Sequence, residues 1–282
     1  MEKWQNRLLR KGVYLKIRIL RERHNVDLMI RPKKHLGQHF LADPNTARKI
    51  AGLISSPLLH TLEIGPGQGA LTRRLMEKCG DFRVVEIDPE AAEFLRKNFH
   101  GLDLHEGDFL KTGEYLFDRT PMNITGNLPY NITSPVLFRV LENRACIREA
   151  VFMVQKEVAE RLTEKPGSRA YGILSVLLAC YFDLEYCFTV SEKVFIPPPK
   201  VKSAVIRLRR RKTVDPPCRY EDLLRVVKTA FGQRRKMLRN GLKSLITNPG
   251  QREKLAALNA LERRPEQLSP AEFAAVTVAL CG

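Results

Sequence analysis

The sequence lacks the patterns that mark membrane, secreted and metal-binding proteins. No apolar run approaches the roughly 20 residues that a helix needs to cross a bilayer; the apolar stretch from Tyr171 to Phe182 is short and predicts a buried helix. The six cysteines are scattered without a C-x-x-C pair, which argues against zinc and against a secreted disulfide framework. His35 and His39 have no partner at a metal-ligand spacing. We therefore expect reduced thiols in a cytoplasmic protein, no membrane partner and no metal.

Acidic residues are scarce relative to basic ones. Lys and Arg total 48 against 31 for Asp and Glu, which gives a formal net charge of +17. Such an excess favours a polyanionic partner, because cations that neutralise phosphates release counterions. Charge alone leaves three kinds of partner open, namely a nucleic acid, an anionic membrane or an acidic protein, and it also fits a basic surface without any such partner.

The N-terminal 31 residues are rich in Arg and Lys but contain neither serine nor the continuous apolar segment of a secretory signal. Three interpretations stay open: a flexible basic RNA-binding arm, a mitochondrial-type presequence, or leader codons upstream of a true start at Met29. We favour the last, because recognisable organisation begins at Arg31. Residues 1–30 are accordingly treated as a basic extension that is flexible or not native. An endogenous protein that begins at Met1 or Glu2 would exclude leader codons.

From Arg31 onward, short apolar strands alternate with helical segments. Asp43-Pro44 is typical of a helix start, with an N-cap residue before a proline at the first helical position. Strands are expected at 60–64, 83–87, 102–105, 122–125 and 150–154, with helical spacing between them at 71–75, 91–99 and 135–141. Two further helices, at 156–162 and 171–181, follow the last of these strands. This alternation predicts a parallel sheet covered on both faces. Two further strands, 183–190 and 203–208, are expected to close the sheet as an antiparallel edge hairpin.

A basic and proline-containing run from Arg209 to Pro217 has the composition of a linker. Everything beyond it has helical periodicity, and Ser269-Pro270-Ala271-Glu272 is typical of a helix start with a capping box. The sequence thus predicts a Rossmann-like α/β domain over residues 31–212 and a small all-helical domain over 217–282.

A glycine-rich turn, Glu63-Ile64-Gly65-Pro66-Gly67-Gln68-Gly69, follows the first strand of the alternation. Gly65 and Gly67 let a ligand approach the backbone closely. The absence of Gly-Lys-Ser/Thr excludes a phosphate-binding P-loop, and the spacing G-x-G-x-x-G of dinucleotide sites is also absent, since Gly69 comes one residue early. The turn alone remains a weak indicator of any one ligand.

Two acidic residues narrow the choice of ligand. Glu86 ends the next strand about twenty residues on, where a carboxylate can bind both ribose hydroxyls; a solvated carboxylate is the alternative, disfavoured because Val84, Val85 and Ile87 are expected to be buried around it. Asp108, after the third strand, can accept from an adenine amino group or cap a helix. Adenosine with an acid-bound ribose, but without a pyrophosphate cradle, suggests S-adenosylmethionine.

Asn127-Leu128-Pro129-Tyr130 follows the fourth strand and suits chemistry on an exocyclic amine. The lone pair of an adenine N6 is delocalised into the ring, so the amine is a poor nucleophile. Hydrogen bonds from N6–H to the Asn127 side chain and to the carbonyl of Leu128 or Pro129 favour a pyramidal nitrogen, a stabilisation that grows toward the transition state. Pro129 stiffens the turn and Tyr130 can stack on the base. A simple loop after a strand is the competing interpretation.

These motifs together resemble the KsgA-type rRNA adenine N6,N6-dimethyltransferases, from Arg31 to the C-terminal part. Leu36-Gly37-Gln38-His39-Phe40-Leu41 is similar to the family's N-terminal cofactor motif, which implies that His39 and Leu41 contact S-adenosylmethionine and that Gln38 lies beside it. Further cofactor contacts are implied for Gly65, Glu86, Asp108 and Asn127, the last of which also serves the target amine. The segment from Phe195 to Val201 resembles the family's later target-base loop, which implies that Phe195 forms a second aromatic wall opposite Tyr130.

The resemblance implies a seven-stranded class I methyltransferase sheet over residues 31–212 with a helical C-terminal domain. It also implies dimethylation of two neighbouring adenosines in the 3′-terminal hairpin of small-subunit (16S) rRNA, within a pre-30S particle, by a monomer. Two alternatives remain: a resistance-type methyltransferase of a large-subunit rRNA adenine, and a non-catalytic RNA-binding assembly factor on the same scaffold.

A cationic cluster near the C-terminus is expected to contact RNA phosphates. A helical stretch is expected to contain Gln233, Arg234, Arg235, Lys236, Arg239 and Lys243. The residues expected to bind RNA phosphates are Arg234, Arg235, Lys236 and Arg239. Lys200 beside the target-base loop is expected to hold the RNA backbone near the pocket. A solvated basic face is the alternative interpretation.

Overall fold

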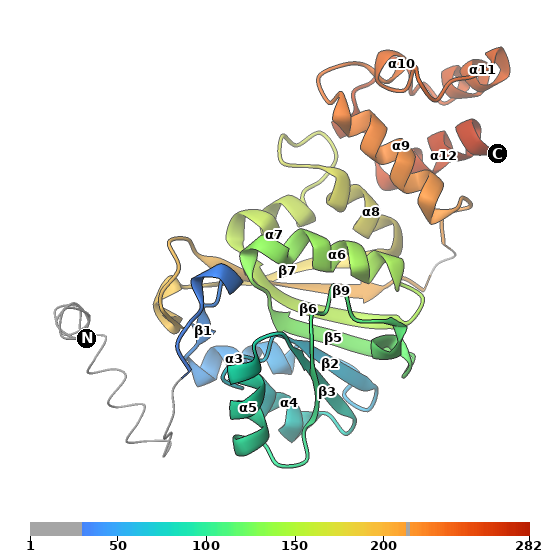
Figure 1. The fold of residues 1–282 in the computed structure, drawn as a ribbon. Coiled ribbons are helices and arrows are strands. Elements are labelled where there is room, and N and C mark those ends of the chain that lie inside the picture. The colour runs from blue at the N-terminus through green and yellow to red at the C-terminus, as the bar shows by residue number, and fades with distance from the viewer. Residues whose placement is uncertain (1–29, 213–214) are drawn as a thin grey trace.

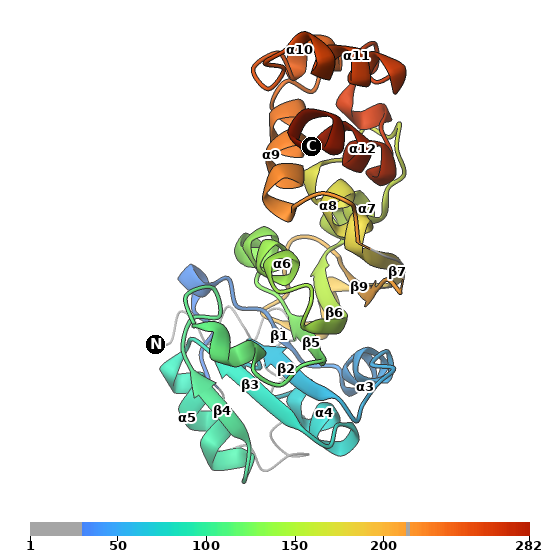
Figure 2. The ribbon, with the colours of Figure 1, turned by 90° about the vertical axis from the view of Figure 1, so that its right-hand side faces the viewer.

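The chain folds around one large sheet. The computed structural model describes residues 30–212 and 215–282, so the predictions for the N-terminal extension lie outside the described residues. The sheet strands are β2 (His60–Ile64), β3 (Phe82–Glu86), β4 (Asp103–Glu106), β5 (Met122–Asn127), β6 (Ile147–Gln155), β7 (Phe182–Val190) and β9 (Ser203–Arg210). They lie in the order β4-β3-β2-β5-β6-β9-β7 (Figure 2).

The pairing of the strands confirms the predicted topology. β2 to β6 are parallel, while β9 runs antiparallel to both β6 and β7. β7 and β9 therefore form the predicted antiparallel hairpin at the edge of the sheet. The predicted linker starts too early, because Arg209 and Arg210 belong to β9, opposite Asp183 and Phe182 of β7. Arg209 points away from the buried Leu208 and is exposed, whereas Arg210 lies on the same face as Leu208 and is paired with Asp215 at 2.5 Å, so both can extend the strand.

Helices cover both faces of the sheet, as the alternation predicted (Figure 1). They are α3 (Pro44–Gly52), α4 (Thr72–Lys78), α5 (Pro89–Asn98), α6 (Thr133–Glu142), α7 (Lys156–Thr163) and α8 (Ile173–Tyr181). Asp43 caps α3, accepting from the Thr46 N–H at 2.9 Å, as predicted. Successive side chains of β6 divide the core: Phe152 packs in the cluster of α6 and α8, and Met153 in the cluster of α3 and α4.

The C-terminal part is helical, as predicted, and stands at the end of the molecule opposite α4 and α5 (Figures 1 and 2). It comprises α9 (Tyr220–Gly232), α10 (Leu238–Gly241), α11 (Pro249–Ala257) and α12 (Pro270–Cys281). The predicted capping box is formed: the Glu272 N–H donates to Ser269 Oγ at 3.2 Å, and the Ser269 N–H donates to the Glu272 carboxylate at 2.8 Å.

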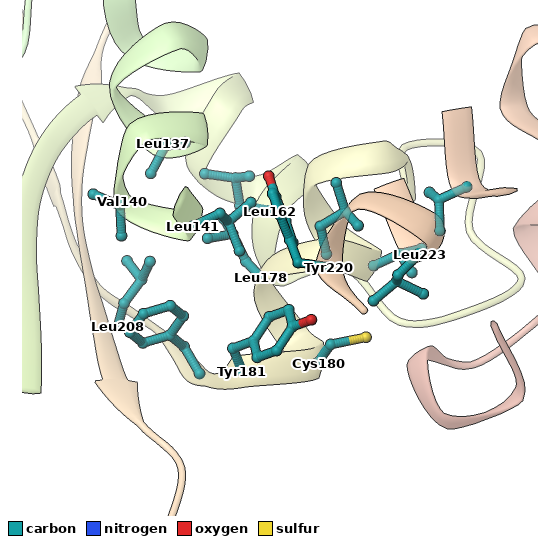
Figure 3. Close-up of a cluster of buried hydrophobic side chains, with 14 of the residues drawn as sticks. Leu137, Val140, Leu141, Leu162, Leu178, Cys180, Tyr181, Leu208, Tyr220 and Leu223 are labelled. Atoms are coloured by element: carbon teal, nitrogen blue, oxygen red, sulfur yellow. The ribbon is translucent and has the colours of Figure 1, made fainter. Parts of the chain in front are cut away.

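The hydrophobic core runs without interruption from the sheet into these helices. Figure 3 shows Leu208 of β9 and Leu141 of α6 in one apolar cluster with Tyr220 and Leu223 of α9. The Arg144 guanidinium lies over two rings at this junction, 4.7 Å from the Tyr181 centroid and 4.8 Å from that of Tyr220. The division into independent domains near residues 212–217 stays a prediction.

A second, two-stranded sheet was not predicted. The residues from 33 to 42, here called the strap, contain β1 (Phe40–Leu41), which pairs antiparallel with β8 (Phe195–Ile196). The Ala42 N–H donates to the Val194 carbonyl at 2.8 Å and extends the pairing. This pairing joins the N-terminal motif to the loop before β9, which lies about 150 positions further along the chain.

Candidate active site

A cleft opens where the parallel strands β2 to β5 end, with the strap along one side. This is the position at which open α/β sheets bind their ligands. The cleft is lined by eleven of the predicted site residues: Gln38, His39, Leu41, Gly65, Gly67, Glu86, Asp108, Asn127, Leu128, Pro129 and Tyr130. The structure thus brings together motifs that are far apart in the sequence.

The glycine-rich turn after β2 forms the floor of one end of the cleft. Gly65 and Gly67 have φ angles of 63° and 55°, in the left-handed region that favours glycine. A Cβ atom on Gly67 would lie 2.8 Å from the Phe40 ring of the strap. Glycine is therefore required at this position for both conformation and space.

Glu86 is buried beside this turn, so the alternative of a solvated carboxylate is wrong. Its exposed fraction is 3%, and its two oxygens accept from the N–H groups of Gly67 and Asp88, each at 2.9 Å. Burial raises the pKa of Glu86 despite these hydrogen bonds. A carboxylate oxygen can accept more than one hydrogen bond. The two Glu86 oxygens can therefore still accept hydrogen bonds from hydroxyl groups in the cleft.

Ile87 corrects one prediction and adds a residue that was missed. It was expected to be buried, but it is 47% exposed and lines the cleft next to Glu86. The strand ends at Glu86, so its run of buried positions stops there. Asp108 Oδ1 accepts from the Leu110 N–H at 2.9 Å in a turn, since no helix begins there, while Oδ2 has Lys111 Nζ at 3.9 Å.

Asp88 fastens the strap over the cleft. Its carboxylate accepts from Lys33 Nζ at 2.6 Å and from Gln38 Nε2 at 2.9 Å, and it also caps α5 through the Glu90 N–H. Burial alone would raise the pKa of Asp88, but the hydrogen bonds from Lys33 and Gln38 lower it below the usual value. Gln38 therefore holds the strap in place while also lining the cleft.

The other end of the cleft is lined by Asn127 and Leu128, each of which carries a hydrogen-bond acceptor. Asn127 Nδ2 donates to the His39 carbonyl at 2.9 Å, which leaves Asn127 Oδ1 as a fixed acceptor. The Leu128 N–H is bonded to Met153 across the sheet, and in the described part of the chain no donor reaches the Leu128 carbonyl. The Pro129 carbonyl, in contrast, accepts from the Ile132 N–H at 3.1 Å. Of the two carbonyls that the sequence left open, that of Leu128 therefore lacks a donor in the described residues, and its role toward the amine stays a prediction.

Tyr130 supplies a half-buried aromatic wall next to these acceptors. Its ring stacks on His39, with centroids 5.8 Å apart and planes 29° apart. Its hydroxyl lies 2.8 Å from Ser203 Oγ. His39 is held in turn, because its Nδ1 lies 2.8 Å from the Pro197 carbonyl and must donate to it. Burial raises the pKa of the Tyr130 hydroxyl, so the group is neutral at physiological pH.

Phe195 does not form the predicted second wall. Its side chain is 3% exposed, packs in the cluster with Leu41 and Ile50, and is absent from the lining of the cleft. The reason is the pairing of β8 with the strap, which places Phe195 opposite Leu41 and over the apolar face of the sheet. The ring that faces Tyr130 is that of His39.

The predicted RNA-binding residues are not on a continuous helix. α9 ends at Gly232, and the residues from Gln233 to Lys236 form a turn. Arg234 is held by the Ser168 carbonyl at 3.2 Å and by Glu266 at 3.7 Å, and Arg239 is paired with Glu262 at 2.7 Å. Arg235, Lys236 and Lys200 are exposed, and contacts between these residues and RNA stay predictions.

Glu63 is a buried acid of the cleft that the sequence reasoning did not single out. Its exposed fraction is 2%, and it accepts from Thr72 Oγ1 at 2.7 Å. Burial, with the charge of Glu86 nearby, raises the pKa of Glu63 to about 8. The side chain is therefore largely protonated at neutral pH, which keeps two adjacent carboxylates from being charged together.

This shift predicts a pH dependence of stability. The unfolded chain releases the Glu63 proton near the ordinary pKa of 4.5, whereas the folded chain retains it up to about 8. The free energy of unfolding should therefore decrease as the pH rises between these two values. Glu63→Gln, which is always neutral, should show a smaller decrease in urea titrations across this range. Parallel curves for the two proteins would contradict the assignment.

The described residues contain no helix long and apolar enough to span a membrane, and no group of three or more His, Cys, Asp or Glu that could hold a metal ion.

The sheet topology, the glycine turn and the buried acid at the end of β3 define the fold and cleft of a class I methyltransferase that uses S-adenosylmethionine. The fit rests on the buried Glu86 carboxylate and on the open space beside Gly65.

Comparison with known proteins extends this assignment. Residues 29–276 match the model of the ribosomal RNA adenine dimethylase family, and the chain belongs to that family. It is 48% identical over 253 residues to ribosomal RNA small subunit methyltransferase A of Bacteroides thetaiotaomicron, covering 88% of this chain and 94% of the relative. The protein of the same name from Flavobacterium johnsoniae is 48% identical over 252 residues, with 88% and 95% covered.

Solved structures share the fold. A dimethyladenosine transferase from Plasmodium falciparum superposes with a TM-score of 0.71 at 24% identity, covering 84% of this chain and 96% of the other. The 23S rRNA methyltransferase ErmE superposes with a TM-score of 0.65 at 28% identity, covering 86% and 99%. These likenesses agree with the seven-stranded sheet described above.

Proposed function

We propose that this protein dimethylates the N6 amines of two adjacent adenosines in the 3′-terminal hairpin of small-subunit (16S) rRNA, acting as a monomer on a pre-30S particle in the cytoplasm. Membership of the adenine dimethylase family and relatives at 48% identity named for the small subunit support the substrate. The observation that supports the mechanism is that Asn127 and Leu128 line the same cleft as Glu86.

The Glu86 end of the cleft would hold the cofactor. Glu86 would accept from the ribose hydroxyls, Ile87 would cover one face of the adenine, and Asp108 Oδ2 would accept from its amino group. Gly65 and Gly67 would let the remainder of the cofactor approach the backbone closely. His39 and Leu41 of the strap would contact the cofactor from the other side. S-adenosylmethionine supplies an electrophilic methyl group when it is bound.

The Asn127 end would bind the target amine. Asn127 Oδ1 and the Leu128 carbonyl would accept the two N6–H groups and so hold the nitrogen pyramidal, with its lone pair directed into the cleft. Both acceptors are fixed before the base arrives, the first by the His39 carbonyl and the second by the bond from Leu128 to Met153. Preorganised acceptors of this kind lower the barrier because they need no rearrangement during the reaction. Tyr130 would stack on the extruded base.

A large-subunit rRNA substrate is the nearest alternative, and ErmE shares the fold at 28% identity. The small-subunit relatives are more similar, at 48%. A purely non-catalytic role is disfavoured by the intact Asn127 and Leu128 acceptors.

The decisive experiment is methylation of ribosomal particles from a strain that lacks this modification, followed by mapping of the modified nucleotides. We expect N6,N6-dimethyladenosine at two adjacent positions near the 3′ end of the small-subunit rRNA. Modification of large-subunit rRNA alone, or of no rRNA, would contradict the proposal.

The ion pairs of the C-terminal turn separate its cations into two groups. Arg235 and Lys236 are exposed and have no ion pair in the described part of the chain, whereas Arg234 and Arg239 are paired. Replacing Arg235 and Lys236 together by Ala should weaken RNA binding and reduce the slope of log affinity against log salt by about 1.5 to 2. Arg96→Ala with Lys97→Ala on α5 removes the same charge at the opposite end and should leave the slope unchanged. An equal slope in all three proteins would mean that the turn is only a solvated surface.

A further inference from the structure

Ser203 is a buried polar residue that touches the aromatic wall of the cleft. It is the first residue of β9, its exposed fraction is 0%, and its hydroxyl lies 2.8 Å from the hydroxyl of Tyr130. Ser203 itself does not line the cleft. A role in the reaction must therefore act through Tyr130.

The hydroxyl of Ser203 is a rigid anchor. The backbone of Ser203 lies inside the sheet, in register with Gln155 of β6 and Val190 of β7. On the other side, the Tyr130 ring rests against His39. Two contacts thus determine where the ring lies: a hydrogen bond at its hydroxyl and a stacked ring on one face. Without the hydrogen bond, the end of the ring that is farthest from the backbone is free to tilt.

The two methyl transfers place unequal demands on this ring. In each transfer the N6 lone pair forms the new N–C bond, the methyl–sulfur bond breaks with its electrons on sulfur, and one N6–H proton leaves to solvent. The unmodified amine has two N–H groups for Asn127 Oδ1 and the Leu128 carbonyl. The monomethylated amine has only one, so a single hydrogen bond orients it. The aromatic face must then restrict the base to a greater extent.

We propose that Ser203 is a positioning residue that fixes the Tyr130 ring through its hydroxyl, and that this contact favours the second methyl transfer more than the first. The proposal rests on the proposed function, since it assumes dimethylation of an adenosine. It identifies a determinant of how many methyl groups the amine receives, distinct from the acceptors that bind the amine.

Tyr130→Phe and Ser203→Ala each remove one partner of the hydrogen bond and keep the aromatic ring. Each should lower the rate of dimethyladenosine formation about three- to tenfold, the effect of one net hydrogen bond. The double variant should be no slower than either single variant, because both changes break the same contact. At equal total methyl incorporation, the RNA modified by each variant should also contain a higher ratio of N6-monomethyladenosine to dimethyladenosine than the RNA modified by the unsubstituted protein. That ratio does not depend on the fraction of active protein.

Thr277→Val is the matched control, because it removes a buried hydroxyl that donates to the Phe273 carbonyl in α12, away from the cleft. It should lower stability without changing the ratio of products. Cofactor affinity, measured by calorimetry, should be unchanged in all variants. The proposal would be overturned if the rate losses of the two single variants multiplied in the double variant. An unchanged product ratio in Tyr130→Phe would also overturn it, even if Ser203→Ala fails to fold. If the unsubstituted protein makes no dimethyladenosine, the proposed function itself fails.

Discussion

Asn127→Ala should reduce methyl transfer by on the order of 10²–10³-fold, as expected for loss of one preorganised group that stabilises the transition state. The variant loses Oδ1, the acceptor that the His39 carbonyl holds in place. Without it, one N6–H has no partner and the nitrogen lone pair stays delocalised into the base. The rate should be measured by single-turnover methylation with labelled cofactor.

The expected loss can be distinguished from unfolding. Asn127 ends β5 at the surface of the cleft rather than in the core, so the unfolding midpoint should change little. Asn127→Asp keeps an acceptor and the side-chain volume, but its carboxylate cannot donate to the His39 carbonyl. This variant should retain more activity than Asn127→Ala but less than the unsubstituted protein. Full turnover by Asn127→Ala would remove the proposed mechanism.

Glu86→Ala should weaken cofactor binding by about 10²–10³-fold and leave RNA affinity nearly unchanged. Hydrogen bonds to a charged group contribute about 1.5–3 kcal/mol each, and two ribose hydroxyls would lose their acceptor. The substitution also removes the partners of the Gly67 and Asp88 N–H groups, which hold the turn and the start of α5. Calorimetric titration with the cofactor measures the effect.

Glu149 provides a matched control for Glu86. It too is a buried carboxylate, 1% exposed, and it accepts from the Ser55 N–H at 2.8 Å, but it lies on β6 outside the cleft. Glu149→Ala should destabilise the fold while the cofactor affinity stays within about twofold of the original. An equal loss of affinity in both variants would show that burial of a carboxylate, rather than its place in the cleft, explains the result for Glu86.

Most of the fold could be predicted because its signals are local. The strand at His60–Ile64 was predicted at its observed limits, since Leu62 and Ile64 lie two positions apart directly before a glycine turn. The capping residues Asp43 and Ser269 were also predicted, because a cap depends on neighbours within four positions. Local chemistry of this kind is visible in a single sequence.

The features that were missed depend on contacts between distant segments. Phe195 was expected to form an aromatic wall opposite Tyr130, but its pairing with the strap buries it. Ile87 continued an apolar run, yet the strand ends one residue earlier and leaves it in the cleft. Gln233–Lys236 had helical composition, although α9 ends at Gly232. Composition does not reveal where a neighbouring segment will pack.

The structure of a complex with a bisubstrate compound, in which adenosine is tethered through N6 to the cofactor, would test the shared cleft. We predict that the ribose of the cofactor half binds to Glu86, and that N6 of the target half lies within hydrogen-bonding distance of Asn127 Oδ1 or the Leu128 carbonyl, with Tyr130 against the base. A complex in which the target base lies outside the cleft, or in which the cofactor half is remote from Glu86, would contradict this arrangement.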